Sequence, residues 1–285
     1  MSKLSAAALV LALVAGLPVA AAATPQEDAY IAARDKYLKR FDKADFSTDA
    51  AQKEMDRAIA ELTEKVEAII GPVTLKGSNV KPHNNLDTLS SGDDTFGHLD
   101  GLAFGPPGNQ QMTMVSTDGL LKSWLTHHKT WWGRDEAQMP QTPAGALKTE
   151  KFYTQAIGFD AAFQFYAELP IVKPASASFA ASYLYVTAQD FGPWKPDMVL
   201  VAVLDGGRVY VVTSKAKTPV PQIAACDAIW KAAEKKSADA KDFDDVRKQG
   251  DADFHRCFAE RAKTMPFFTK VTAEAQALVD TLPLK

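Results

Sequence analysis

The sequence has few of the residues on which metal-dependent and redox proteins rely. Its 285 residues include only two cysteines and five histidines, and the cysteines lack the C-x-x-C spacing of a zinc or thiol-redox motif. A glycine-rich phosphate loop and the G-x-S-x-G elbow of serine hydrolases are absent from it, and no S-x-x-K is followed by the partner motifs of penicillin-recognising enzymes. We therefore expect no metal and no cofactor, and no short motif indicates a reaction.

An excess of positive charge is also absent. The chain carries 32 Lys and Arg against 35 Asp and Glu, which gives a formal net charge of −3. Nucleic-acid binding needs a concentrated basic face, so we expect no nucleic acid as a partner. After residue 23 no long apolar run occurs, so we expect no stable membrane insertion of that part of the chain.

The first 23 residues have the three parts of a secretory signal peptide. Lys3 gives a positive start, residues 4–17 are almost entirely apolar, and residues 21–23 are the alanines of a cleavage site. A membrane anchor is the alternative, but the apolar stretch is shorter than the roughly 20 residues of a spanning helix. The segment predicts export to the periplasm or the medium, with residues 24–285 as the mature chain.

The two cysteines of an exported chain predict a disulfide. Cys226 and Cys257 lie in two consecutive expected helices, so a bridge would staple an antiparallel pair if those helices pack side by side. A catalytic Cys257 beside His255 is the alternative. It is the weaker one, because an exported thiol with a single partner is usually oxidised.

Residues 24–71 predict a helical hairpin. Thr24 and Glu27 form a capping box around Pro25, which suits the first helical position. If cleavage exposes Thr24, this cap lies at the end of the chain and we expect it to fray. The second helix opens at Ser47 or Thr48, carries apolar residues at steps of three and four, and ends at Gly71.

Residues 72–218 are mainly β in pattern, and residues 219–285 are helical again. Apolar residues alternate with others after Phe163 and Phe179, as in half-buried strands. Gly206 and Gly207 lie between two β-branched runs, which predicts a tight hairpin. Residues 76–100 and 139–145 are expected to be loops. The order of helices, strands and helices predicts a single α+β domain around an antiparallel meander.

Two clusters are candidates for chemistry or binding. Asp94, His98 and Asp100 could form an acid–base pair or hold a divalent ion, although a polar turn explains the same residues. The second cluster is aromatic, because one of two adjacent tryptophans is expected at the surface, where it could stack on a sugar, a peptide or an aromatic ligand. Its members are Trp131, Trp132 and Arg134, with Trp194 in a separate aromatic-proline turn.

These features favour a non-enzymatic binding or interaction protein of the bacterial cell envelope. Its partner would be a small molecule, a glycan or an envelope protein. Two alternatives stay open at this point. One is an exported hydrolase with an Asp/His site around His98, with or without a metal. The other is a periplasmic inhibitor or immunity-type protein.

Overall fold

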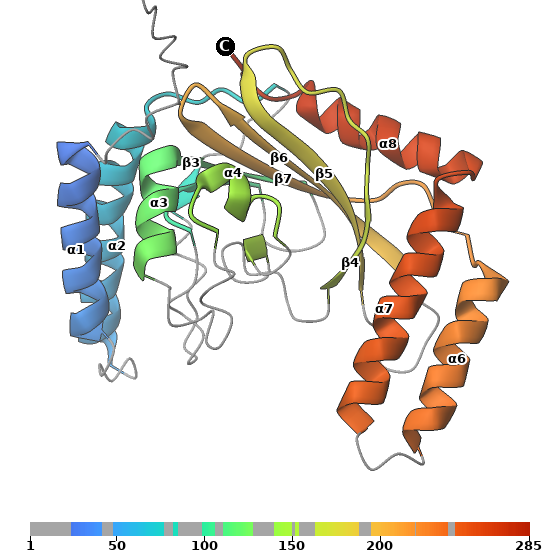
Figure 1. Ribbon diagram of the computed structural model, residues 1–285. Coiled ribbons are helices and arrows are strands. Elements are labelled where there is room, and N and C mark those ends of the chain that lie inside the picture. Colours follow the sequence, from blue (N-terminus) through green and yellow to red (C-terminus); the bar gives the residue numbers. More distant parts are fainter. Residues whose placement is uncertain are drawn as a thin grey trace, which may run out of the picture.

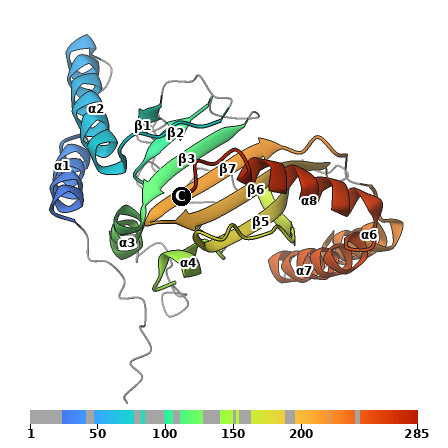
Figure 2. The same ribbon diagram turned by 90° about the horizontal axis from the view of Figure 1, so that it is seen from above.

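The fold is built on one antiparallel sheet of seven strands, in the order β1-β2-β3-β7-β6-β5-β4 (Figures 1 and 2). The computed structural model describes residues 24–41, 48–76, 82–84, 99–105, 111–127, 140–149, 152–153, 163–187, 195–219, 221–238 and 243–285. The strands are β1 (His83–Asn84), β2 (Leu102–Phe104), β3 (Met112–Thr117), β4 (Phe163–Glu168), β5 (Ala177–Thr187), β6 (Lys195–Asp205) and β7 (Arg208–Lys215). The predicted α+β class and the antiparallel pairing are both confirmed.

Strands β4 to β7 form a meander in which each strand pairs with the next. The turn between β6 and β7 is made by Gly206 and Gly207, whose φ angles are 54° and 81°. Positive φ at both central positions is what a two-residue hairpin of type I′ requires. Asp205 pairs with Arg208 across this turn, so the predicted hairpin is confirmed in position and register.

The N-terminal helical hairpin packs at the β1–β3 side of the sheet (Figure 2). It consists of α1 (Pro25–Phe41) and α2 (Asp49–Ile70). The Ala51 N–H donates to Thr48 Oγ1 over 3.3 Å, and Gly71, with φ of 69°, ends α2. The caps that the sequence contains therefore set the bounds of α2.

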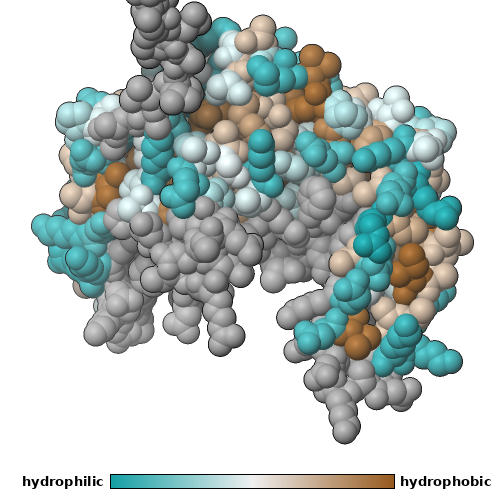
Figure 3. Space-filling view, viewed as in Figure 1, coloured by the Kyte–Doolittle hydropathy of each residue, from teal (hydrophilic) through white to brown (hydrophobic). Residues whose placement is uncertain are grey.

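The C-terminal helices are α6 (Ala224–Ala238), α7 (Phe243–Ala262) and α8 (Pro266–Val279). A disulfide joins Cys226 to Cys257, whose Cα atoms are 5.6 Å apart, so α6 and α7 lie side by side as predicted. They extend away from the sheet next to β4 (Figure 1), and their outer surface mixes hydrophilic residues with small hydrophobic patches (Figure 3). None of the helices that the structure describes is long and apolar enough to cross a membrane.

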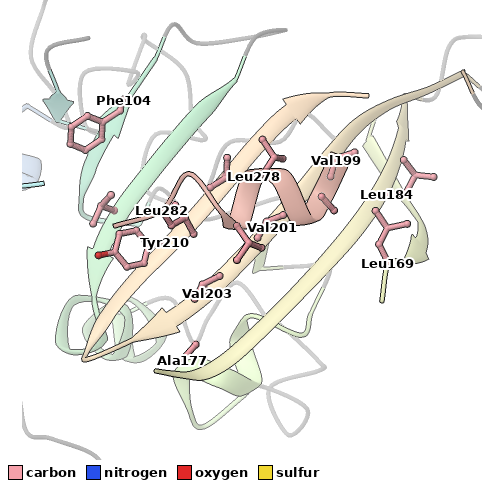
Figure 4. Packing of buried hydrophobic residues seen from close by; sticks show 14 of the residues in the cluster. Phe104, Leu169, Ala177, Leu184, Val199, Val201, Val203, Tyr210, Leu278 and Leu282 are labelled. Atoms are coloured by element: carbon pink, nitrogen blue, oxygen red, sulfur yellow. The ribbon is translucent and has the colours of Figure 1, made fainter. Parts of the chain in front are cut away.

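One face of the sheet forms the larger core beneath α8 (Figure 4). Leu278 of α8 and Leu282 just after it lie over Val199, Val201 and Tyr210 of the central strands. These side chains come from alternate positions of β6 and β7, as a face of a sheet requires. The α8 helix is thereby fixed across the centre of the sheet.

The opposite face is covered by α3 (Asp118–His127) and α4 (Pro143–Ala146). Trp124 of α3 is fully buried there and packs edge-on to Phe152, with ring centroids 5.3 Å apart. The helix α4 overlaps the stretch 139–145 that was predicted as a loop. It forms there because Thr142 caps it and Pro143 begins it. The short strand β1 likewise lies within the stretch 76–100 that the sequence indicated as a loop.

Candidate ligand-binding site

A cavity of about 680 Å³ lies beside the first half of β5, a volume within the range of small-ligand sites. Both ribbon views place α4 beside the beginning of β5 (Figures 1 and 2), and Lys148, just after α4, is one of the residues that line the cavity. The residues that line the cavity are Lys148, Glu168, Lys173, Ser178, Phe179, Ala180, Ala181 and Tyr183.

The cavity follows a part of the β5 edge with which no described strand pairs, which we call the open edge. Strand β4 pairs with β5 only from Tyr183 to Thr187, and the Leu169 N–H adds a hydrogen bond of 2.8 Å to the Ser182 carbonyl. Strand β6 pairs with β5 back to Ala177. Among the described strands, residues 178–181 therefore have a neighbour on the β6 side alone. Because main-chain groups alternate between the two sides of a strand, the N–H and C=O of Ala180 point the same way as the Ser182 carbonyl, away from β6.

Two prolines explain why β4 stops where it does. Pro170 has no N–H to donate to the sheet, and Pro174 repeats this restriction four residues later. The chain between them is attached to α8, because the Val172 N–H donates to Gln276 Oε1 over 2.8 Å. Val172 itself is 74 % exposed, the one large hydrophobic residue so exposed in the part of the chain that is described.

Charged side chains of opposite sign line the cavity. Lys148 Nζ lies 5.8 Å from the centre of the Phe179 ring, which is a cation–π contact. Glu168 is paired with Tyr183 in the register of β4 and β5. The distance from Phe179 to Tyr183 along β5 is about 13 Å, at about 3.3 Å per residue. Lys148 and Glu168 are both exposed side chains, so their charges are available to a ligand.

A third charged side chain, Lys173, binds main-chain carbonyl groups of the protein itself. Its Nζ donates to the carbonyl oxygens of Ala177 and Pro174, and the Ala177 N–H donates to the Pro174 carbonyl over 3.1 Å. These bonds tie the chain after β4 to the beginning of β5. Lys173 therefore shapes the cavity wall and adds one positive charge to it.

Two tyrosines fix the wall formed by the chain after α4. The hydroxyls of Tyr183 and Tyr153 both donate to the Leu147 carbonyl, over 3.1 and 2.6 Å. Their ring centroids are 5.7 Å apart. The residue that follows Leu147 is Lys148, so these two bonds also hold the main chain beside Lys148 in place.

Burial keeps both phenols neutral. It raises the pKa of Tyr153 well above its usual value of 10.0. Burial, and then the negative charge of Glu168, raise the pKa of Tyr183 to about 12. Neither phenol can act as a base at neutral pH, so the cavity offers charges, ring faces and a strand edge rather than an acid–base pair.

One of the predicted catalytic residues, Asp100, has a place in the described structure. The residue is 1 % exposed, and its carboxylate accepts hydrogen bonds from Arg34 and from the Tyr30 hydroxyl, the latter over 2.8 Å. Burial raises the pKa of Asp100 above its usual value, while Arg34 and Tyr30 act in the opposite direction. These contacts hold α1 against the chain before β2, which is a structural role.

The other predicted site residues lie outside the described residues. They are Asp94, His98, Trp131, Trp132, Arg134 and Trp194. Within the described ranges, no three His, Cys, Asp or Glu side chains gather closely enough to hold a metal ion. The predicted Cys226–Cys257 pair does lie within the described residues, and its disulfide is present.

Comparison with known proteins found no match to a family model, to a curated protein or to a solved structure. The functional interpretation of the cavity therefore depends on its geometry alone. Sequence reasoning did not single out Lys148, Glu168 or Phe179 as a group. The sequence signal that could have located this region is the pair of prolines after β4, because a proline ends the pairing of a strand.

Proposed function

We propose that this protein is an exported, non-enzymatic binding protein of the bacterial cell envelope, and that its ligand is a short extended peptide. The observation that carries the proposal is the edge of β5 at residues 178–181, with which no described strand pairs, in a cavity lined by Lys148 near Phe179 and by Glu168 opposite Tyr183. An extended peptide is the ligand that uses all three features, because it adds a strand to an open edge and has a charge at each terminus.

The direction and the length of the peptide follow from the charges. Its ammonium would lie near Glu168 and its carboxylate near Lys148, so it would run antiparallel to β5, in the direction that β4 has where it pairs with that strand. A span of about 13 Å holds three to four extended residues, at about 3.3–3.6 Å each. The Ala180 N–H and C=O would bind its main chain, and the Phe179 and Tyr183 rings would contact its side chains.

Export is part of this proposal and has separate support. A signal-like segment precedes Thr24, and the Cys226–Cys257 disulfide is of the kind found mainly in exported proteins. The periplasm and the medium are both compatible with these two features.

Isothermal titration calorimetry with short peptides tests the proposed ligand. We would titrate the protein with apolar tetrapeptides that carry free termini, and then with their N-acetylated and C-amidated forms. We expect the free peptide to bind and each blocked end to weaken binding about 2–5-fold, the value of an exposed ion pair. Absence of binding, or equal affinity for all three forms, would overturn the proposal.

Two variants assign each terminus to its residue. Lys148→Ala is expected to weaken binding of the free peptide. Binding of the C-amidated peptide should stay unchanged, because amidation has already removed the carboxylate that would pair with Lys148. Glu168→Gln should behave likewise toward the acetylated peptide. Lys65→Ala and Glu64→Gln, exposed positions on α2, are the matched controls and should change neither.

A further inference from the structure

A buried carboxylate lies beside the residue that export would make the first of the chain. Glu27, in the first turn of α1, is 5 % exposed. Its Oε2 accepts a hydrogen bond of 2.7 Å from the main-chain nitrogen of Thr24, and the Glu27 N–H donates to Thr24 Oγ1 over 3.2 Å. This reciprocal pair is the capping box that the sequence predicted.

The same carboxylate also touches the beginning of a second helix. Its Oε1 accepts a hydrogen bond from the Thr117 hydroxyl, and Thr117 Oγ1 accepts the Leu120 N–H at the start of α3. A Cβ atom on Gly119 would lie 2.3 Å from Glu27 Oε2. The carboxylate thus lies between the first turns of α1 and α3, where both helix dipoles favour a negative charge.

No cationic side chain of the described residues forms an ion pair with Glu27. A buried carboxylate without a counter-ion is costly, because protein dipoles replace only part of its lost hydration. In the full chain, Thr24 donates through an amide N–H. In a chain that begins at Thr24, the same nitrogen is an ammonium, 2.7 Å from the carboxylate.

We infer that the Ala23–Thr24 bond is the point of cleavage by a signal peptidase, and that the new Thr24 ammonium forms an ion pair with Glu27. The hydrolysis adds water across this amide, leaving a carboxylate on Ala23 and the ammonium on Thr24. The inference rests on the export part of the proposed function and not on the peptide ligand. With this ion pair we expect the capping box at the new chain end to stay ordered and not to fray, because the Thr117 hydroxyl also holds the Glu27 carboxylate.

Titration of the amino terminus tests the ion pair. The protein is made with Thr24 as its first residue, and the α-amino group is followed by pH-dependent reactivity with an amine reagent. Its usual pKa is about 8, and pairing should make it lose its proton about one pH unit higher. Glu27→Gln should remove this difference, whereas Glu61→Gln on α2 should not. An α-amino group that titrates alike with and without Glu27 would overturn the inference.

A chain with one extra residue provides a second readout. In a chain that starts at Ala23, the Thr24 nitrogen is again an amide and the ion pair is lost. The equilibrium constant for unfolding should therefore be about tenfold smaller for the chain that starts at Thr24 than for the chain that starts at Ala23. Glu27→Gln should abolish that difference. Equal unfolding constants for the two chains would contradict the ion pair. The mass of the protein from the exported fraction then tests the cleavage. A chain that begins at Thr24 supports the inference, cleavage elsewhere overturns it alone, and failure to be exported overturns the export proposal as well.

Discussion

Glu168 lies directly opposite Tyr183 in the register that pairs β4 with β5. Tyr183 is 5 % exposed, and its hydroxyl donates to the Leu147 carbonyl over 3.1 Å. Burial first, and the charge of Glu168 second, raise the pKa of Tyr183 to about 12. The folded protein therefore keeps this phenol neutral, because an anionic tyrosine would be buried and would repel Glu168.

This pair predicts a loss of stability in alkali. The folded pKa of Tyr183 exceeds its usual value of 10.0, so its contribution to stability is complete below that pH and is lost as the pH rises toward about 12. In an ultraviolet absorbance titration, Tyr183→Phe should remove one phenol that ionises in this upper range. Glu168→Gln should shift its ionisation to lower pH. An unchanged titration curve in Tyr183→Phe would contradict this assignment.

The buried ion pair of Arg34 and Asp100 predicts an asymmetric effect of mutation. Arg34 is 4 % exposed, and Arg34→Leu leaves the Asp100 carboxylate buried without its cation, so we expect a loss of about 3–5 kcal/mol in urea unfolding. The double variant Arg34→Leu, Asp100→Leu should lose less than Arg34→Leu alone, because no charge is left buried.

A surface ion pair provides the control for this experiment. Arg40 pairs with Glu54, and their side chains are 60 % and 46 % exposed. Arg40→Leu should therefore lower the free energy of unfolding by less than about 1 kcal/mol. A loss in Arg34→Leu no larger than that in Arg40→Leu would show that the buried pair does not hold α1 in place.

The disulfide predicts a graded loss of stability. Cys226 and Cys257 are 31 residues apart in sequence, and opening a loop of this size should lower the free energy of unfolding by about 3–4 kcal/mol. The sheet, α1 and α2 do not depend on the bridge, so the double variant Cys226→Ala, Cys257→Ala should stay folded with a lower melting temperature. Circular dichroism that shows complete unfolding at room temperature would contradict this view.

The parts of the fold that follow from short-range sequence signals were predicted well. Thr48 and Gly71 mark the two ends of α2, and Gly206 and Gly207 form the turn between β6 and β7. Both could be predicted because caps and tight turns depend on residues close in the chain. Helix α4 was missed because its four residues carry no periodic pattern. Its cap, Thr142 before Pro143, was the only local signal.

The cavity could not be predicted in the same way. It needs Lys148 after α4 to reach Phe179 on β5, and it needs β4 to end opposite Tyr183. Both relations depend on strand register and on packing between distant segments, which no periodicity reveals. Pro170 is the one local sign that β4 stops there. Asp100 was singled out for chemistry because it lies close to His98 in the sequence, whereas its ion partner, Arg34, lies on a helix that no local pattern connects to it.

Amide hydrogen exchange at Ala180, followed by NMR with and without a saturating tetrapeptide, tests the central claim most directly. If the peptide adds a strand to the open edge of β5, the Ala180 N–H gains an acceptor and its exchange should slow at least tenfold. The Ala202 N–H, on the central strand β6, should change little. If the peptide binds and the Ala180 N–H still exchanges at its original rate, the proposed mode of binding is wrong.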